Sequence, residues 1–249
     1  MESGTEQVDI SRFDAAPERA LAWHREGAGA VLATVVDTWG SAPRRTGAQL
    51  VVAGDGRMEG SVSGGCVEGA VIVEAQEALQ TGRHKLLEFG VSDEDAFAAG
   101  LACGGTIRGL LEPVGKTLPE ETLEALVLAR SERRALAYEV NLPSGEGRLV
   151  NPASYPERMK TDRSGVEEDG ETFVAVHNPP LRLIVVGAVH IAQALVPMAR
   201  LAGYDPVLIE PRAAFGSAER FPGETIVDDW PDEAVEQLGL DGRTALVLL

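Results

Sequence analysis

The stretch SVSGGCVEGAVIVEAQEALQTG, residues 61–82, joins a glycine-rich turn to a segment whose apolar residues recur at helical spacing. This pattern predicts an α-helix from about Val67 that stops at Gly82, because glycine readily takes the left-handed conformation that ends a helix. Cys66 therefore lies where a loop becomes a helix. The first N–H groups of a helix have no internal partner, so this position attracts anions and favours a reactive thiolate.

Two interpretations of Cys66 follow from its surroundings. In one, Gly64 and Gly65 let a ligand approach the main chain without a Cβ in the way, and the thiol takes part in binding. In the other, Cys66 is a small core residue in a tight glycine turn, since cysteine is commonly buried. The second cysteine, Cys103, is followed by another glycine pair in GLACGGTIRG, residues 100–109. A single ligand site that both cysteines share would explain why each of them adjoins a pair of glycines.

Composition limits the classes of function. The chain has 249 residues, enough for two domains, and a formal net charge of −17. Such an acidic surface repels nucleic acids and anionic membranes, so neither is expected as a partner. Two cysteines make no disulfide framework and the polar N-terminus resembles no secretory signal, which favours the cytoplasm. No segment suits a membrane span, and the cysteines and histidines lack the spacing of a zinc site.

Residues 1–178 are expected to form an α+β domain. Asn178, Pro179 and Pro180 form the linker that ends it. Helices are predicted over 14–26, with Asp14 as the cap, over 67–82, 92–99 and 118–134. Strands are predicted over 30–38, 49–52 and 106–114, and a short strand is predicted after the turn at 54–56. Residues 134–150 and 171–180 are predicted to form a strand and a hairpin, and residues 151–170 a loop.

The pattern changes at residue 181 to alternating strands and helices, which is typical of half a Rossmann fold. Strands are predicted over 181–187, 206–210 and 244–249, and helices over 191–203 and 228–240, giving a three-stranded parallel sheet. Its last strand is apolar and leaves an uncovered edge. We therefore expect either a truncated domain or a domain whose layer is completed by a partner subunit, with a homodimer as the preferred arrangement.

A partial dinucleotide-binding fingerprint lies at the first turn of this second domain. Gly187 and His190 open the helix, and Glu210 follows about twenty residues later at the end of the next strand. The second glycine of the fingerprint is replaced by Val189, whose Cβ crowds the path of a pyrophosphate. Nucleotide binding through Gly187, His190 and Glu210 is one hypothesis, and an ordinary position at a helix start is the other interpretation of His190.

Three long motifs in the first domain resemble the XdhC/CoxI family, the accessory proteins of xanthine dehydrogenase and related molybdenum hydroxylases. They are VLATVVDTWGSAPRRTGAQLVV (31–52), GSVSGGCVEGAVIVEAQEAL (60–79) and GVSDEDAFAAGLACGGTIRGLLEPV (90–114). The resemblance covers about residues 14–114 and, more loosely, 181–249. It implies a non-catalytic chaperone that binds molybdenum cofactor (molybdopterin), holds it while a cysteine desulfurase supports its sulfuration, and passes it to an apo-hydroxylase.

The resemblance also implies which residues form a cofactor pocket. Arg44 is expected to bind the phosphate or the pterin, or else to be a solvated residue beside Arg45. Glu68 is expected to orient the pterin amino group, or else to have a capping or surface role. Cys66 and Cys103 are candidate metal ligands. The predicted cofactor-binding set is Ser41, Arg44, Ser63, Gly64, Gly65, Cys66, Glu68, Cys103, Gly104 and Gly105.

Two other classes of function remain open beside the chaperone. One is an NAD(P)-dependent oxidoreductase or nucleotide-binding module that uses the Rossmann-like half. The other is a scaffolding protein for a cysteine desulfurase and a hydroxylase. The predicted fold class is α/β, with an α+β XdhC/CoxI-like cofactor-handling domain over residues 1–178 and a partial Rossmann-like βαβαβ domain over residues 181–249.

Overall fold

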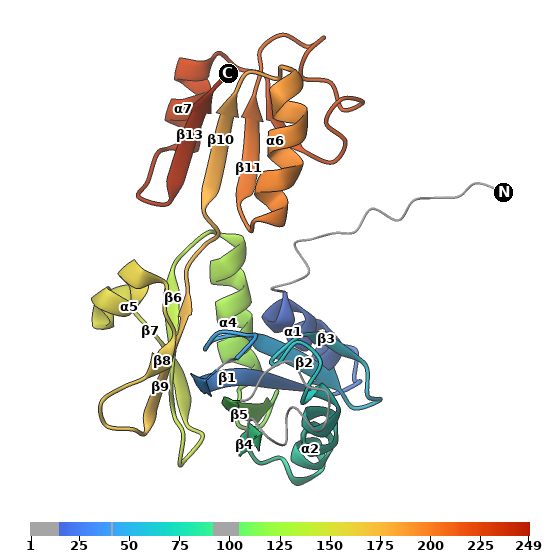
Figure 1. Cartoon of the computed structure of the whole chain (residues 1–249), viewed down its shortest axis with the longest axis vertical. Helices are drawn as coiled ribbons and strands as arrows, with labels where there is room; N and C mark the ends of the chain where they lie inside the picture. Colours follow the sequence, from blue (N-terminus) through green and yellow to red (C-terminus); the bar gives the residue numbers. More distant parts are fainter. Residues whose placement is uncertain (1–14, 41, 92–104) are drawn as a thin grey trace, which may run out of the picture. The chain divides into compact units, whose positions relative to one another are not determined.

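The structure, a computed structural model, describes residues 15–40, 42–91 and 105–249 (Figure 1). The chain divides into two compact units, whose described parts are residues 15–178 and 179–249. Each unit is described by itself below. The predicted helix over 92–99 and the predicted cap Asp14 lie outside the described residues, and the N-cap position of the first helix is Ala15, without a capping side chain.

The first unit is built on a five-stranded antiparallel sheet of order β3-β2-β1-β5-β4. Alternation along the central strand divides its side chains between two cores: Val31, Ala33 and Val35 pack toward α2, whereas Leu32 and Val36 join the core with α1 and α4. The strands are β1 Ala30–Gly40, β2 Gln49–Ala53, β3 Met58–Gly60, β4 Lys85–Val91 and β5 Gly105–Pro113, and the helices are α1 Ala16–Arg25, α2 Glu68–Thr81 and α4 Glu120–Ser131.

The predicted helix after the glycine turn is confirmed as α2. It ends at Gly82, which adopts the left-handed conformation with φ of 67°. The N–H of Gly82 donates to the carbonyl of Ala78, so the last turn is closed by the residue type that the sequence pattern required.

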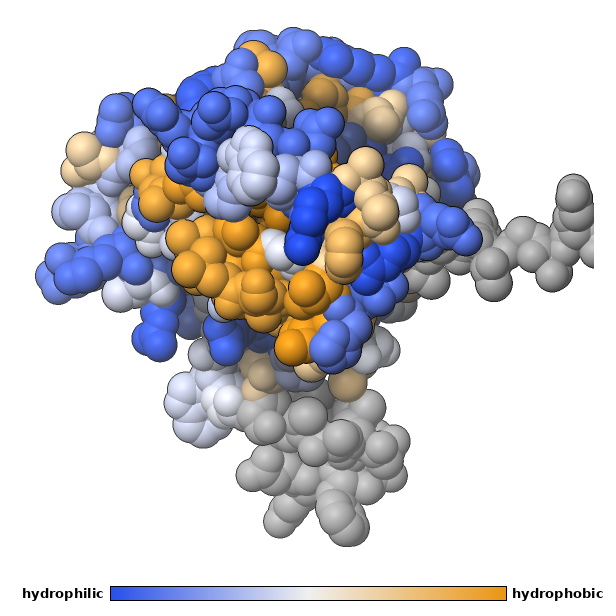
Figure 2. All heavy atoms as spheres, turned by 90° about the horizontal axis from the view of Figure 1, so that it is seen from above, coloured by the Kyte–Doolittle hydropathy of each residue, from blue (hydrophilic) through white to orange (hydrophobic). Residues whose placement is uncertain are grey.

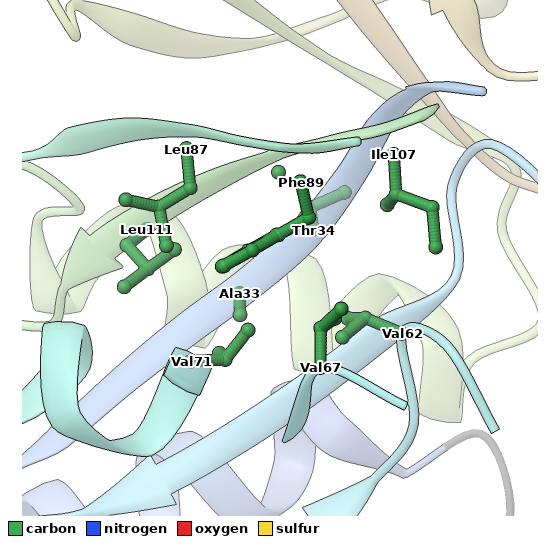
Figure 3. Close-up of a pocket in the computed structure, with 10 residues that line it drawn as sticks. Ala33, Thr34, Val62, Val67, Val71, Leu87, Phe89, Ile107 and Leu111 are labelled. Atoms are coloured by element: carbon green, nitrogen blue, oxygen red, sulfur yellow. The ribbon is translucent and has the colours of Figure 1, made fainter. Parts of the chain in front are cut away.

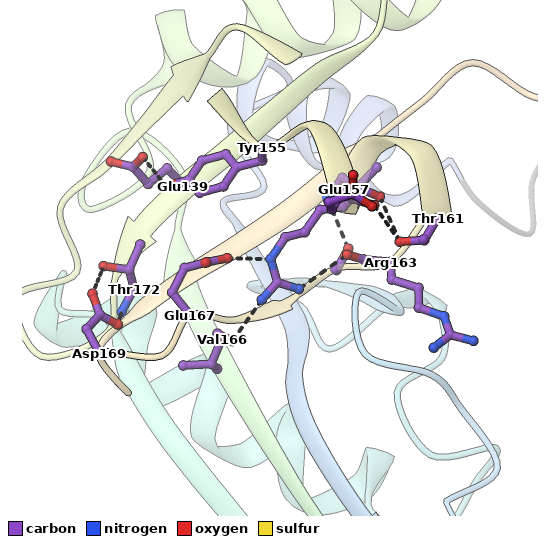
Figure 4. Close-up of polar contacts among 12 residues, drawn as sticks. Glu139, Tyr155, Glu157, Thr161, Arg163, Val166, Glu167, Asp169 and Thr172 are labelled. Atoms are coloured by element: carbon purple, nitrogen blue, oxygen red, sulfur yellow. Dashed lines mark hydrogen bonds and ion pairs between the residues drawn. The ribbon is translucent and has the colours of Figure 1, made fainter. Parts of the chain in front are cut away.

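A second antiparallel sheet in the first unit has the order β7-β6-β9-β8. Its strands are β6 Leu136–Asn141, β7 Gly147–Val150, β8 Gly165–Val166 and β9 Thr172–His177. The prediction of a loop over 151–170 is wrong in part, because this segment holds a 3-10 turn at Pro152–Ser154, the helix α5 Pro156–Thr161 and β8. Tyr155 donates to Glu139 at 2.6 Å, and Arg158 donates to the Val166 carbonyl at 2.8 Å, which fixes α5 against the sheet (Figure 4).

The second unit contains a parallel sheet of order β12-β11-β10-β13. The prediction of three strands missed β12, which has only three residues. Helix α6 packs on one face with Leu183 and Val185, and α7 packs on the other with Ile184. The α/β fold class is thereby confirmed. The elements are β10 Arg182–Val186, α6 His190–Leu201, β11 Asp205–Ile209, β12 Thr225–Val227, α7 Pro231–Leu238 and β13 Thr244–Leu248.

A buried carboxyl group joins the two sheets of the first unit. Glu112 on β5 is 1% exposed and accepts a hydrogen bond of 2.6 Å from the hydroxyl of Tyr138 on β6. Burial raises the pKa of Glu112 to about 7, although the Tyr138 hydrogen bond opposes the change. Because the pKa in the unfolded chain is lower, the folded state loses stability as the pH rises from 4.5 toward 7.

We expect Glu112→Gln to remove this pH dependence. The amide keeps the shape and the acceptor for Tyr138 but cannot ionise. The unfolding free energy of the variant minus that of the wild type should therefore be about 1–3 kcal/mol more positive at pH 8 than at pH 4.5. Urea denaturation of both proteins at the two pH values measures the change, and any constant cost of the amide cancels in the comparison. An equal difference between the two proteins at both pH values would contradict the account.

Candidate functional site

The loop over residues 61–67 is organised by a single carboxylate. Glu68, the first residue of α2, is 5% exposed and folds back under the loop. Its Oε1 accepts from the Ser61 hydroxyl at 2.7 Å, the Ser63 N–H at 2.9 Å and the Val62 N–H at 3.2 Å. Its Oε2 accepts from the Gly65 N–H at 2.9 Å and from the Ser63 hydroxyl. Five donors therefore converge on one buried anion.

Glu68 remains ionised despite its burial. Desolvation alone would raise its pKa, but the hydrogen bonds from the Ser63 and Ser61 hydroxyls and from backbone N–H groups outweigh it and lower the pKa to about 2. The carboxylate thus has an internal role, which corresponds to the capping alternative for this residue rather than to an oxygen aimed at a ligand.

Two serines extend the internal network to the rest of the loop. The Ser61 hydroxyl accepts from the Gly64 N–H at 2.9 Å, and the Ser63 hydroxyl accepts from the Val67 N–H at 2.9 Å. Gly64 and Gly65 have φ of 75° and 114°, values that side chains other than glycine rarely allow. Their N–H groups point inward, so the two glycines serve the shape of the loop and are not donors to a ligand.

Cys66 is exposed at the outside of this loop. The interpretation of Cys66 as a small buried core residue is therefore wrong. Its neighbours on both sides are held from within by Glu68 and Ser63, so the thiol is carried by a fixed backbone. The loop presents a single sulfur atom to solvent.

The chain between β1 and β2 lies beside this loop. The Nε of Arg44 donates to the Ser61 carbonyl at 3.1 Å. Pro43 lies close to Gly64, since a Cβ built at the glycine would be 3.6 Å from the proline ring. Arg44 is half-buried, and no described carboxylate forms an ion pair with it. Its guanidinium charge therefore adjoins the turn that carries the thiol.

The beginning of β5 faces the same side of the sheet. Gly105 pairs with Gly40 of β1 and with Val91 of β4, and Ile107 two residues later points to the same face. Ile107 lines a small apolar pocket with Val62 and Val67, which flank the 61–67 loop (Figure 3). As lined by the described residues, the pocket holds only about 10 Å³, which is room for a single water and not for an organic ligand.

The structure thus brings together most of the predicted cofactor-binding residues that it describes. Six of them lie in or against the 61–67 loop, and Gly105 lies on the same sheet face. The predicted residues Ser41, Cys103 and Gly104 lie outside the described residues. The six are Arg44, Ser63, Gly64, Gly65, Cys66 and Glu68.

Two absences bear on the class of site. Across the described ranges, no group of three or more histidine, cysteine, aspartate or glutamate side chains could hold a metal ion. Among these residues, Cys66 is therefore not part of such a group. Within the same ranges, no helix is long and apolar enough to cross a membrane.

The predicted nucleotide-binding residues of the second unit lie at the carboxyl ends of its strands. Gly187 has φ of 106°, and His190 begins α6 on the surface. Glu210 is 1% exposed and accepts from Arg212 at 2.7 and 2.8 Å and from the Ala188 N–H at 2.9 Å. The bonds from Arg212 are the main cause that lowers the pKa of Glu210 to about 2. This carboxylate is engaged within the protein.

The fold and site define a class of protein: a two-unit α/β chain that joins a thiol-bearing glycine loop to a Rossmann-like unit. The family model of the XdhC and CoxI family matches residues 23–90, and the model of the XdhC Rossmann domain matches residues 183–249. Together these matches span more than half of the chain. The chain belongs to the XdhC and CoxI family.

Individual relatives agree with this assignment. The chain is 35% identical over 196 residues to the molybdenum cofactor insertion chaperone PaoD of Escherichia coli, a match that takes in 78% of this chain and 56% of PaoD. It therefore spans little more than half the length of that relative. It is 23% identical over 239 residues to a probable xanthine dehydrogenase subunit from Bacillus subtilis, covering 88% of this chain and 71% of that one.

A solved structure shows the same fold. The crystal structure described as a xanthine dehydrogenase from Bacillus halodurans superposes with a TM-score of 0.74 over 94% of this chain and 74% of that chain, at 21% sequence identity.

We expect Glu68→Gln to disturb the loop, because all five partners of the carboxylate are donors and the amide nitrogen would face some of them. At pH 7 the variant should lose about 2–3 kcal/mol in unfolding free energy. The folded pKa lies below the unfolded one, so this contribution is present above pH 4.5 and declines as the pH falls toward 2. Urea denaturation between pH 7 and pH 3 measures it.

Glu77→Gln is the matched control for this variant, since Glu77 is an exposed glutamate in the last turns of α2 that pairs with Lys85. It should change the unfolding free energy by less than about 1 kcal/mol. Equal effects of the two substitutions on the unfolding free energy would contradict the role of Glu68 in holding the loop.

Proposed function

We propose that this chain binds molybdenum cofactor at the 61–67 loop and delivers it to the apo form of a molybdenum hydroxylase, without catalysing a reaction of its own. The observation that carries the proposal is the exposed Cys66 thiol on a loop fixed from within by Glu68. Membership of the XdhC and CoxI family and the likeness to PaoD, which is described as a molybdenum cofactor insertion chaperone, support it.

The chemistry of the loop fits such a cargo. The cofactor is a pterin that holds molybdenum through a dithiolene and carries a phosphate. The soft sulfur of Cys66 suits a metal that brings most of its ligands with it. The guanidinium of Arg44, fixed to Ser61 by its Nε, leaves its terminal nitrogens for a phosphate oxygen. Cys103, Gly104 and Ser41 belong to the same proposed site.

The exposure of the loop suits a carrier better than an enzyme. The pocket that the described residues leave beside the loop is too small for the pterin, so the proposal places the cargo against the exposed side of the loop. A ligand held in this way can be handed to a deeper site in a client protein. We further propose that a cysteine desulfurase supplies the terminal sulfur while the cofactor is bound, and that the chain acts as a homodimer.

For the alternative of an NAD(P)-dependent oxidoreductase, the use of NAD is less well supported. An NAD site of the Rossmann type uses an acidic side chain after the second strand to accept the ribose hydroxyls. Glu210 has that position, but Arg212 and the Ala188 N–H already occupy both of its oxygens. A scaffolding role without cofactor binding is separated from the chaperone role by the experiment below.

We expect the purified chain to bind isolated molybdenum cofactor and to activate an inactive, cofactor-free hydroxylase in the presence of a cysteine desulfurase and a sulfur donor. Cys66→Ala should lower cofactor affinity at least tenfold, because the metal loses the exposed sulfur of Cys66. Ultrafiltration with molybdenum analysis measures binding separately from activation. Activation by a wild-type chain that binds no cofactor would support the scaffold and overturn the chaperone.

Arg44→Gln should weaken cofactor binding by about 10- to 100-fold, the loss expected for a charged hydrogen bond to phosphate. Arg45→Gln is the matched control, since it removes the same charge at the adjacent, exposed position. Affinity measured at two salt concentrations tests the ionic character of the contact, which should weaken at higher salt. If the two variants bind equally, Arg44 has no specific role.

A further inference from the structure

Two arginines gather at the carboxyl edge of the parallel sheet in the second unit. Arg212 follows β11 and stacks on Phe215, with its guanidinium carbon 4.2 Å from the ring centroid. The guanidinium of Arg220 lies 5.8 Å from the same centroid. The two distances place the guanidinium carbons within about 10 Å of each other, close enough for both to contact one phosphorylated sugar.

Both arginines are tied to the turn between β10 and α6. The N–H of Ala188 donates to Glu210, which holds Arg212, whereas the carbonyl of Ala188 accepts from Arg220 at 2.9 Å. Arg220 also contacts the Gln193 side chain on α6 at 3.3 Å. The positions of both cations therefore depend on the segment that opens α6, whose N-terminus has no capping side chain.

The two arginines differ in their partners. Glu210 receives four hydrogen bonds, from the Ala188 N–H and from the backbone N–H, Nε and Nη2 of Arg212, which fill the acceptor positions of a carboxylate. Arg220 bonds to the carbonyls of Ala188 and Phe215 and to Gln193, and no described carboxylate pairs with it. Arg220 therefore lies beside the start of α6 without a carboxylate partner among the described residues.

We propose that Arg212 and Arg220 form a phosphate-binding site that takes the phosphorylated ribose of a nucleotide, of the kind that carries a 2′-phosphate. A saturated Glu210 offers no acceptor for an unmodified ribose diol, and an arginine near this position is the general means of accommodating a 2′-phosphate. Arg212 presents its side chain to solvent at 57% exposure, so its remaining nitrogen is accessible to the ligand.

Apolar surface at the same edge supports a nucleotide over a free anion. Phe215 is 40% exposed and Ile191, in the first turn of α6, is 50% exposed. Figure 2 looks onto this edge and shows hydrophobic side chains gathered in a patch bordered by hydrophilic ones. A planar base gains contact area on such a surface, whereas inorganic phosphate does not. The site uses none of the residues of the proposed function, so each proposal can fail without the other.

The test is a calorimetric titration of the full chain with NADP⁺, NAD⁺ and inorganic phosphate at low salt. We expect NADP⁺ to bind at least tenfold more tightly than NAD⁺ or phosphate, and its affinity to fall as salt is added. Equal affinity for NADP⁺ and NAD⁺ would overturn recognition of the 2′-phosphate. Phosphate as tight as NADP⁺ would overturn a nucleotide site, and binding of none of the three would overturn the proposal entirely.

Variants locate the site. Arg220→Gln and Arg212→Gln should each reduce NADP⁺ affinity at least tenfold, and Arg220→Lys should retain part of it. Arg200→Gln is the control, because Arg200 lies in the same unit and pairs with Glu224. Circular dichroism checks that each variant folds. Arg212→Gln leaves Glu210 unpaired and could fail to fold for that reason. In that case the proposal is tested by Arg220→Gln and by the affinities of the wild-type chain for NADP⁺, NAD⁺ and phosphate. NADP⁺ binding unaffected by Arg220→Gln would overturn the assignment.

Discussion

The buried carboxylate of Glu68 is the constraint on which the thiol loop depends. An anion removed from water is costly unless several donors surround it, and here five donors from a seven-residue loop do so. Meeting that requirement turns the N–H group of Gly65 toward Glu68, while the Gly64 N–H donates to the Ser61 hydroxyl, and Cys66 is left on the outside. The chemistry that the loop can offer, one sulfur on a fixed backbone, is a consequence of satisfying this charge.

The second unit uses a related arrangement with a different result. Glu210 is also buried at the end of an element and also accepts an N–H from a neighbouring turn, that of Ala188. Its charge is balanced by Arg212, whereas Glu68 has hydroxyl and backbone donors and stands at the start of α2, where the helix dipole favours an anion. The arrangement around Glu68 therefore exposes a thiol, and the arrangement around Glu210 exposes a guanidinium.

The sequence allows the prediction of elements whose signals are local. The helix that ends at Gly82 has both apolar periodicity and a glycine cap, and its prediction is confirmed. The strand β12, at 225–227, is too short to show alternation, and α5, at 156–161, is stabilised by the contacts of Arg158 with distant residues. The inward direction of Glu68 is equally invisible in the sequence, because an acidic residue in the first turn of a helix usually faces water.

The chain is acidic and yet has candidate anion sites. The two are compatible because repulsion by the net charge and attraction by a nearby guanidinium act over different distances. At physiological ionic strength, charges more than about 8 Å apart are largely screened, so the net charge of −17 contributes little at a particular guanidinium. A nucleic acid needs many neutralised phosphates and meets the whole acidic surface. A ligand with one or two phosphates needs only Arg44 in one unit, or Arg212 and Arg220 in the other. The same charge distribution therefore disfavours large polyanions and leaves small phosphorylated ligands able to bind.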